Sequence, residues 1–177
     1  MLIWEVFGYL ALGLAAAFVA ALTLTVLFGA PYLPTRRDHA QVAVSLAGLR
    51  PGQTLVDLGC GDGRLLVMAA RQGFRAVGYE INPFLALISW WRGRAFPGRV
   101  KVYWGNFWRR NLPAETAAVF VFAAGPYLSR LGRYLSRQAG QTEQGLVLIS
   151  YAFALPAHRP IKRHGPFWVY KIPGRPK

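Results

Sequence analysis

The sequence predicts an α/β fold: a Rossmann-like, mostly parallel sheet with a terminal antiparallel hairpin, preceded by one long apolar helix. A short apolar run, Leu55–Leu58, leads into glycines at alternate positions and then into the helix-like stretch Leu65–Ala70. That order of strand, glycine turn and helix opens nucleotide-type α/β domains. Further apolar runs alternate with helix-like segments, and an alternating stretch around His164 closes the chain.

The glycine turn indicates what kind of ligand the domain binds. Gly59, Gly61 and Gly63 follow the first strand, and glycine lets a ligand lie directly on the backbone. Asp57 and Asp62 flank the same turn and would repel the pyrophosphate of a dinucleotide. Two carboxylates suit a cationic or hydroxyl-rich ligand instead. The single cysteine, Cys60, also lies in this turn, where a space-filling role is favoured over that of a catalytic thiol.

The second strand adds a ribose-binding signal. It ends in Glu80, about 20 residues after the turn, where a carboxylate accepts hydrogen bonds from ribose hydroxyls. A ligand with a ribose, no phosphate and a positive charge is S-adenosylmethionine. Three of the seven acidic residues are gathered at these positions. The pattern resembles the first motif of the seven-strand S-adenosylmethionine-dependent methyltransferases; the alternative is a Rossmann-like turn without a ligand.

A transmembrane helix is expected within residues 1–30, ahead of a methyltransferase domain at 31–177. The uncharged segment Val6–Ala30 can cross a hydrocarbon core of about 30 Å at about 1.5 Å per residue. A cleaved signal peptide is disfavoured because the chain begins Met-Leu-Ile-Trp-Glu, and a buried core helix is the other alternative. Arg36 and Arg37 follow the segment, so the positive-inside rule predicts a single-pass protein with a cytoplasmic domain.

The other elements alternate as a seven-strand sheet requires. Asn82 is the expected N-cap of the third domain helix, with Pro83 in its first turn. Helices are predicted at about 38–47, 64–72, 83–94 and 126–138, strands at about 54–57, 76–80, 100–104, 117–122 and 146–151, and a hairpin within 160–172. The sequence leaves little room for a helix between the fifth and sixth strands.

Three stretches narrow the family. They are Pro31-Tyr-Leu-Pro-Thr35 directly after the apolar helix, Asp57-Leu-Gly-Cys-Gly-Asp-Gly-Arg64, and Gly73-Phe-Arg-Ala-Val-Gly-Tyr-Glu-Ile-Asn-Pro-Phe84. With Trp108 in the loop after the third strand, they resemble the ATP synthase c-subunit lysine methyltransferase family and its prokaryotic relatives. The resemblance runs from Pro31 to about Tyr127. It implies a membrane-anchored enzyme that uses S-adenosylmethionine to methylate an accessible lysine of a protein, and the expected substrate is a membrane protein.

The motif and the resemblance together assign site residues. Asp57 and Asp62 are expected near the methionine end of the cofactor, with the backbone of Gly59, Cys60, Gly61 and Gly63 approaching it, Glu80 on the ribose, Ile81 and Asn82 bordering the adenine, and Asn106 and Phe107 covering it. The candidates for positioning the substrate in catalysis are Tyr127, Trp108, Tyr32 and Thr35. Asn106 departs from the family, in which many members carry an acid there. No metal site is expected.

Methyl transfer to an amine mainly requires alignment of nitrogen, methyl and sulfur, so no catalytic dyad is needed. None is evident, and His39, His158 and His164 are expected to be exposed or structural rather than catalytic. Whether a side chain acts as general base stays open. Phe107, Trp108 and Tyr127, in the loops after the third and fourth strands, are expected to line a channel that tolerates a cation.

The net charge of +14 favours an anionic neighbour, and beside a membrane helix this is an anionic lipid surface. The basic residues are scattered, so no nucleic-acid partner is expected. Alternatives remain open: a small-molecule, lipid-headgroup or quinone methyltransferase, a nucleic-acid methyltransferase or binding module, and a membrane scaffold with a relic fold.

Overall fold

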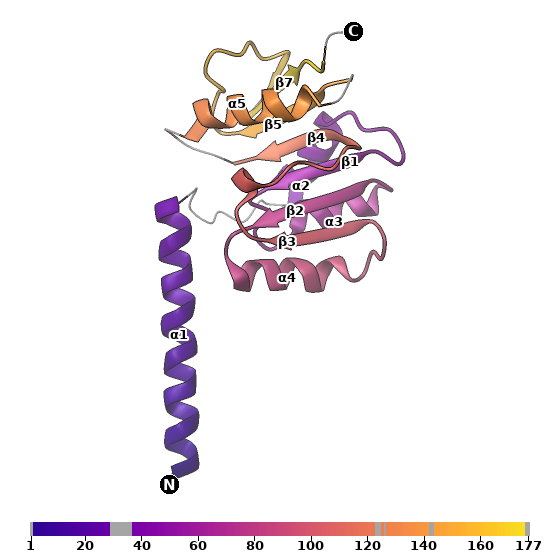
Figure 1. Ribbon diagram of the computed structural model, residues 1–177. Coiled ribbons are helices and arrows are strands. Elements are labelled where there is room, and N and C mark those ends of the chain that lie inside the picture. The colour runs from indigo at the N-terminus through magenta and orange to yellow at the C-terminus, as the bar shows by residue number, and fades with distance from the viewer. Residues whose placement is uncertain (1, 29–36, 123–124, 126, 142–143, 176–177) are drawn as a thin grey trace.

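A seven-stranded sheet forms the centre of the computed structural model, which describes residues 2–28, 37–122, 125, 127–141 and 144–175 (Figure 1). Its strands are β1 (Thr54–Leu58), β2 (Arg75–Glu80), β3 (Val100–Trp104), β4 (Thr116–Val121), β5 (Leu146–Tyr151), β6 (Lys162–His164) and β7 (Phe167–Ile172). They lie in the order β3-β2-β1-β4-β5-β7-β6. The first five are parallel, whereas β7 runs antiparallel to β5 and β6 antiparallel to β7. The predicted sheet with its terminal hairpin is confirmed.

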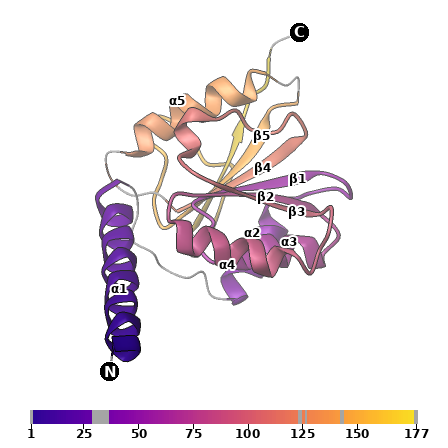
Figure 2. The ribbon, with the colours of Figure 1, turned by 60° about the horizontal axis from the view of Figure 1, so that its bottom comes forward.

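Four helices cover the two faces of this sheet: α2 (Arg37–Leu46), α3 (Arg64–Arg71), α4 (Pro83–Gly93) and α5 (Tyr127–Ala139). Figures 1 and 2 show α2, α3 and α4 on one side and α5 on the other. Helix α5 illustrates why they pack there, because Leu128, Leu131 and Leu135 share one buried stripe while its arginines face outward. One apolar core lies between the sheet and α5, and a second lies between the sheet and helices α2 and α3.

The observed elements follow the predicted ones closely. Asn82 caps α4, since its side-chain oxygen accepts hydrogen bonds from the backbone N–H groups of Phe84 and Leu85. The fourth strand begins and ends one residue earlier than expected, at Thr116 and Val121. Between β3 and β4 the chain forms only the short 3-10 helix η1 (Phe107–Arg109), and residues 152–161 contain no helix, as expected.

The first helix, α1 (Leu2–Phe28), extends away from the sheet (Figures 1 and 2). Its segment Ile3–Ala20 has a mean hydropathy of 1.8 and is wholly exposed, so by length and composition it qualifies as a membrane span. Among the described residues, a ring contact joins it to the domain: Phe18 and Phe84, at the start of α4, have centroids 5.5 Å apart.

Candidate active site

The glycine turn after β1 lies where the strand order of the sheet reverses. From β1 the chain proceeds to β2 on one side, while β4 pairs with β1 on the other. The N–H groups of Gly59 and Cys60 both donate to the carbonyl oxygen of Tyr79 in β2, at 2.9 and 3.0 Å. This fixes the turn at the carboxyl edge of the strands, the usual ligand position in open α/β sheets.

Two glycines of the turn are required for different physical reasons. Gly59 is exposed with φ +101°, and a Cβ placed on it would meet no other heavy atom within 4 Å. Gly63 caps α3 at φ +80°, and its Cβ would collide with the Ser89 hydroxyl of α4. Gly63 therefore allows close packing between helices, whereas Gly59 presents bare backbone to open space, as a bound cofactor requires.

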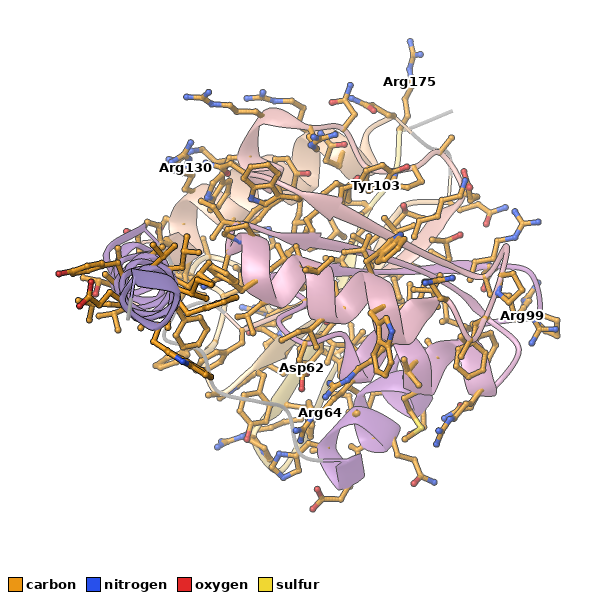
Figure 3. All side chains as sticks on the ribbon, turned by 90° about the horizontal axis from the view of Figure 1, so that it is seen from below. Asp62, Arg64, Arg99, Tyr103, Arg130 and Arg175 are labelled. Carbon is orange, nitrogen blue, oxygen red and sulfur yellow. The ribbon has the colours of Figure 1, made fainter. Side chains whose placement is uncertain are left out.

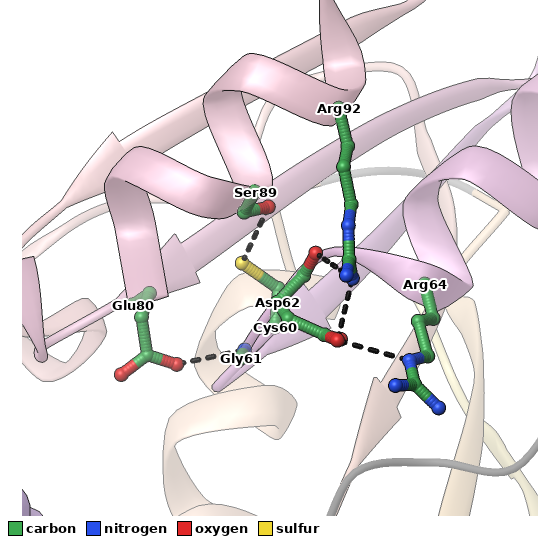
Figure 4. A network of polar contacts seen from close by, with 7 residues as sticks. All are labelled: Cys60, Gly61, Asp62, Arg64, Glu80, Ser89 and Arg92. Carbon is green, nitrogen blue, oxygen red and sulfur yellow. Dashed lines mark hydrogen bonds and ion pairs between the residues drawn. The ribbon is translucent and has the colours of Figure 1, made fainter. Parts of the chain in front are cut away.

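Glu80 connects the turn to the end of β2 through both carboxylate oxygens. Oε2 accepts from the N–H of Gly61 at 2.8 Å and Oε1 from the N–H of Asn82 at 2.9 Å. Burial raises the pKa of Glu80, and these backbone hydrogen bonds oppose the rise. Each oxygen can accept a second hydrogen bond, so the carboxylate fits a ribose diol. Figure 4 shows Glu80 reaching the turn at Gly61.

Asp57 is a poorly compensated acidic group of the site. It is buried in the sheet at the end of β1, and its Oδ1 has no hydrogen-bond partner among the described residues. Burial, followed by repulsion from Glu80 and Asp62, raises the pKa of Asp57 well above its ordinary value. A cationic group placed nearby would stabilise the ionised carboxylate. The residues present therefore fit a positively charged ligand.

Asp62 lies in the same turn but has a different environment. Its carboxylate pairs with Arg64, whose Nε is 2.9 Å away, and with Arg92 of α4. The Arg92 guanidinium also donates to the carbonyl oxygen of Asp62 at 2.9 Å. Figure 4 shows Arg64 and Arg92 meeting at Asp62, on the side of the turn away from Glu80. Two cations thus offset this charge, and the expected place of Asp62 near a methionine moiety stays a prediction.

Cys60 packs inside the turn against bare backbone. A Cβ on Gly78 of β2 would lie 2.6 Å from the Cys60 sulfur, so the absence of that Cβ creates the space that the thiol fills. The sulfur also lies 3.5 Å from the Ser89 hydroxyl. Burial, with repulsion from Asp57, raises the pKa of Cys60 and disfavours the thiolate. This agrees with a space-filling role.

The residues expected around the adenine come from two loops. Asn82 is buried and committed to capping α4, while Ile81 is exposed beside it. The Asn106 side chain accepts from the N–H of Trp108 at 3.0 Å and so shapes its own loop. Phe107 packs against Trp108 with centroids 4.5 Å apart. Their contacts with an adenine stay predictions.

The expected substrate-positioning residues are only partly within the described chain. Tyr32 and Thr35 lie outside the described residues. Trp108 packs edge-on against Tyr134 of α5, with centroids 5.7 Å apart, and the Arg130 guanidinium lies 4.5 Å from the centre of its ring. Tyr127 begins α5 and is half-buried. A role for any of them at the acceptor amine stays a prediction.

Sequence reasoning missed a group of aromatic residues at the carboxyl ends of β4 and β5. Phe122 follows β4, and Tyr151 and Phe153 stand at and beyond the end of β5. Their rings contact one another, with Phe122 5.7 Å from Tyr151 and 6.1 Å from Phe153 between centroids. Their positions at the ends of two predicted parallel strands could have indicated the group, since the carboxyl ends of parallel strands meet at one edge of the sheet.

Replacing Asp57 with asparagine is expected to change the pH dependence of folding. A carboxyl whose pKa is raised by folding binds more protons in the folded state. The free energy of unfolding therefore falls as pH rises from the ordinary carboxyl range through the raised pKa. Without ligand, Asp57→Asn should lose most of this fall and gain on the order of 1–3 kcal/mol near pH 8. Urea titrations between pH 4 and about 8 measure the free energy of unfolding of both chains. Parallel dependences on pH for the two chains would contradict the prediction.

The solved structures support the fold around this site. An RNA methyltransferase from Salinibacter ruber, solved in complex with S-adenosyl-L-homocysteine, superimposes with a TM-score of 0.71 and 25% identity. The match covers 80% of this chain and 94% of that one. A geranyl diphosphate methyltransferase, solved with SAM, gives a TM-score of 0.55 at 23% identity over 64% of this chain and 48% of that one.

Curated relatives identify the family. The Mus musculus ATP synthase c-subunit lysine N-methyltransferase is 32% identical over 80% of this chain and 58% of its own length. The Caenorhabditis elegans protein of the same name is 32% identical over 97% and 96%. The Mus musculus adenine nucleotide translocase lysine N-methyltransferase is 32% identical over 81% and 64%. The chain thus spans little more than half of the first of these relatives. Residues 57–162 match the ANTKMT methyltransferase domain, and this chain belongs to that family.

Proposed function

We propose that this chain is an S-adenosylmethionine-dependent methyltransferase that modifies the side-chain amine of a lysine in a membrane protein, at the membrane surface. Three relatives carry lysine N-methyltransferase in their names, with the ATP synthase c-subunit or the adenine nucleotide translocase as the named protein. The observation that carries the proposal is the glycine turn, where open backbone lies beside a buried Glu80 and a buried Asp57 whose Oδ1 has no hydrogen-bond partner among the described residues.

S-adenosylmethionine is the cofactor that this arrangement fits. When bound, it supplies a methyl group activated by a positively charged sulfur. Glu80 accepts hydrogen bonds from the ribose hydroxyls, and the bare backbone of Gly59 lets the ligand approach closely. The Asp57 carboxylate offsets the positive charge across the turn. Glu80 would thus hold the ribose and Asp57 would offset the positive charge of a ligand that carries no phosphate.

The acceptor lysine must be a neutral amine at the moment of methyl transfer, because only the lone pair attacks carbon. With a pKa of about 10.4, losing a proton near pH 7.4 costs about 4 kcal/mol. Burial beside a positive charge lowers the lysine pKa and reduces that cost. The remaining task of the chain is to align the nitrogen with the methyl carbon, which is catalysis by positioning.

Action at the membrane surface is supported by α1 and α4. We infer that residues 1–30 form a single transmembrane span and that 31–177 form a cytoplasmic domain, since Arg36 and Arg37 follow the span. On the outer face of α4, Leu87, Trp90 and Trp91 are 60, 50 and 66% exposed. Exposed tryptophans suit a membrane interface. Phe18 of α1 contacts this helix at Phe84.

The charge distribution favours lipid over nucleic acid. The net charge is +14, yet Figure 3 shows Arg99, Arg130 and Arg175 at widely separated parts of the domain. A nucleic-acid interface gathers its basic residues on one face, whereas here the outward-facing arginines of α5 are one group among others at distant parts of the domain. Scattered charge instead supports a general attraction to an anionic bilayer.

Tritiated S-adenosylmethionine, the purified full chain and membranes from a deletion strain of the source organism test the proposal. We expect one labelled protein band, with the label on methylated lysine after hydrolysis. A Glu80→Ala chain serves as the inactive control. Label that passes into the lipid extract without a protein band would instead establish the alternative, a lipid-headgroup, quinone or other small-molecule methyltransferase. If replacing the labelled lysine with arginine left the label in place, lysine specificity would be wrong.

A further inference from the structure

An aromatic cluster stands at the carboxyl edge of the sheet, beside the glycine turn. We define the edge cluster as Phe122, Tyr151 and Phe153. Phe122 contacts both other rings, with centroids 5.7 Å from Tyr151 and 6.1 Å from Phe153. Phe122 and Tyr151 are half-buried, and Phe153 is 38% exposed. The cluster therefore presents ring surface to an incoming group.

The register of the sheet places the edge cluster next to the cofactor turn. Leu58 of β1 pairs with Val121 of β4, and Val121 pairs with Ser150 of β5. The next residue on each strand is Gly59, Phe122 and Tyr151. Because neighbouring strands lie about 4.8 Å apart, the Phe122 backbone is about one strand spacing from the turn.

These residues also point to the same side of the sheet. Asp57 pairs with Phe120, two residues before Gly59 and Phe122, and side chains two apart on a strand share a face. Phe120 packs into the core beneath α2 and α3. The side chains of Asp57 and Phe122 therefore lie on the same face of the sheet, at the edge where we propose that the methyl group is transferred.

The cluster is held in place by specific contacts. The Tyr151 hydroxyl lies 3.1 Å from Nδ1 of His39 on α2, and the two rings have centroids 5.4 Å apart. The Ser150 hydroxyl donates to the carbonyl oxygen of Phe153 at 2.7 Å. Between Tyr151 and Phe153, Ala152 has φ +68°, a left-handed conformation that costs a non-glycine residue energy. Backbone strain of this kind gathers at functional sites.

We propose that the edge cluster binds the acceptor amine, a primary or methylated ammonium on a flexible aliphatic stem, and that His39 positions Tyr151 for it. The inference rests on the proposed function and names its acceptor site. Aromatic faces attract ammonium groups and pack against the methylene stem. The rings accept a methylated amine as readily as the primary amine, because they recognise the charge of the ammonium group and form no hydrogen bond with it.

The test uses the full chain in detergent, saturated with S-adenosylhomocysteine, and n-butylammonium as the probe. Ligand-detected NMR titration gives its affinity, and n-butanol serves as the uncharged comparison. Phe122→Leu and Phe153→Leu are expected to weaken n-butylammonium binding about tenfold and n-butanol binding less than about threefold. Because Phe153 is exposed, its variant remains informative if Phe122→Leu does not fold. Phe74→Leu, just before the amino end of β2, is the matched control.

The His39 variants separate positioning from simple packing. His39→Ala should weaken n-butylammonium binding about as much as Phe153→Leu, whereas His39→Asn should restore it, because the asparagine amide can still reach the Tyr151 hydroxyl. Equal weakening by both His39 variants would overturn the positioning role. Wild-type affinity in Phe122→Leu and Phe153→Leu, or equal losses for both probes, would overturn the acceptor site. A wild-type chain that binds S-adenosylhomocysteine but not n-butylammonium overturns this inference alone; a chain that binds neither overturns the proposed function too.

Discussion

A Glu80→Gln substitution is expected to weaken S-adenosylmethionine binding at least about a hundredfold while the chain stays folded. Glu80 is the acid that joins the glycine turn to the second strand, through the N–H groups of Gly61 and Asn82. The glutamine keeps the shape but loses the charge and turns one acceptor into a donor. Weakening the two charge-assisted hydrogen bonds between Glu80 and the ribose hydroxyls, at about 1.5–3 kcal/mol each, gives a loss of that size.

Calorimetry measures this loss, and a thermal melt followed by circular dichroism checks the fold. Glu115→Gln is the matched control, because Glu115 is exposed just before β4 and far from the turn. Its cofactor affinity should equal that of the unchanged chain. If Glu80→Gln bound as tightly as that control, Glu80 would not hold the ribose and the site would need another assignment.

Local patterns explain how much of the site could be predicted from the sequence. Gly59 and Gly63 both adopt positive φ, Asn82 caps α4, and Glu80 ends the second strand, as expected from neighbouring residues alone. Each of these features depends on the preferences of residues within a few positions. Turn and cap chemistry is local, so one sequence is sufficient to predict it.

Contacts between distant segments were not predictable in this way. Asp62 was expected near the methionine end of the cofactor, and its ion pair with Arg92 of α4 was not foreseen. The hydrogen bond between His39 and Tyr151 joins residues separated by more than half of the chain. Sequence reasoning treated His39 as exposed or structural, because no periodicity shows which side chain of β5 it meets. Packing of elements decides such pairs.

The surface proposed to face lipid and the proposed cofactor site lie on neighbouring elements of the domain. Helix α4 follows its N-cap Asn82, whose backbone N–H donates to the Glu80 carboxylate, and continues to the exposed Trp90 and Trp91. The same helix supplies Arg92 to the turn residue Asp62. A bilayer that held α4 would therefore hold the glycine turn at a fixed depth. This geometry suits an acceptor lysine that emerges close to the membrane surface.

Alanine at Gly63 is expected to destabilise the fold far more than alanine at Gly59, although both glycines have positive φ. Backbone strain costs each variant on the order of 1–3 kcal/mol. Gly63→Ala adds a collision with the hydroxyl and, at 3.0 Å, the Cα of Ser89. Overpacking against the backbone of α4 should cost about 1–3 kcal/mol more. Urea unfolding of the two chains measures the difference.

Cofactor binding should show the opposite preference, which makes the pair its own control. A methyl group on Gly59 enters open space in the free chain, so most of its effect falls on the ligand that would occupy that space. Gly59→Ala should therefore stay folded at room temperature and lose S-adenosylmethionine binding in calorimetry. If it bound the cofactor with unchanged affinity, the backbone at Gly59 would not be the surface on which the cofactor lies. Equal unfolding free energies for the two variants would show that α4 yields at Ser89, and that the helices around the turn pack less tightly than their contacts require.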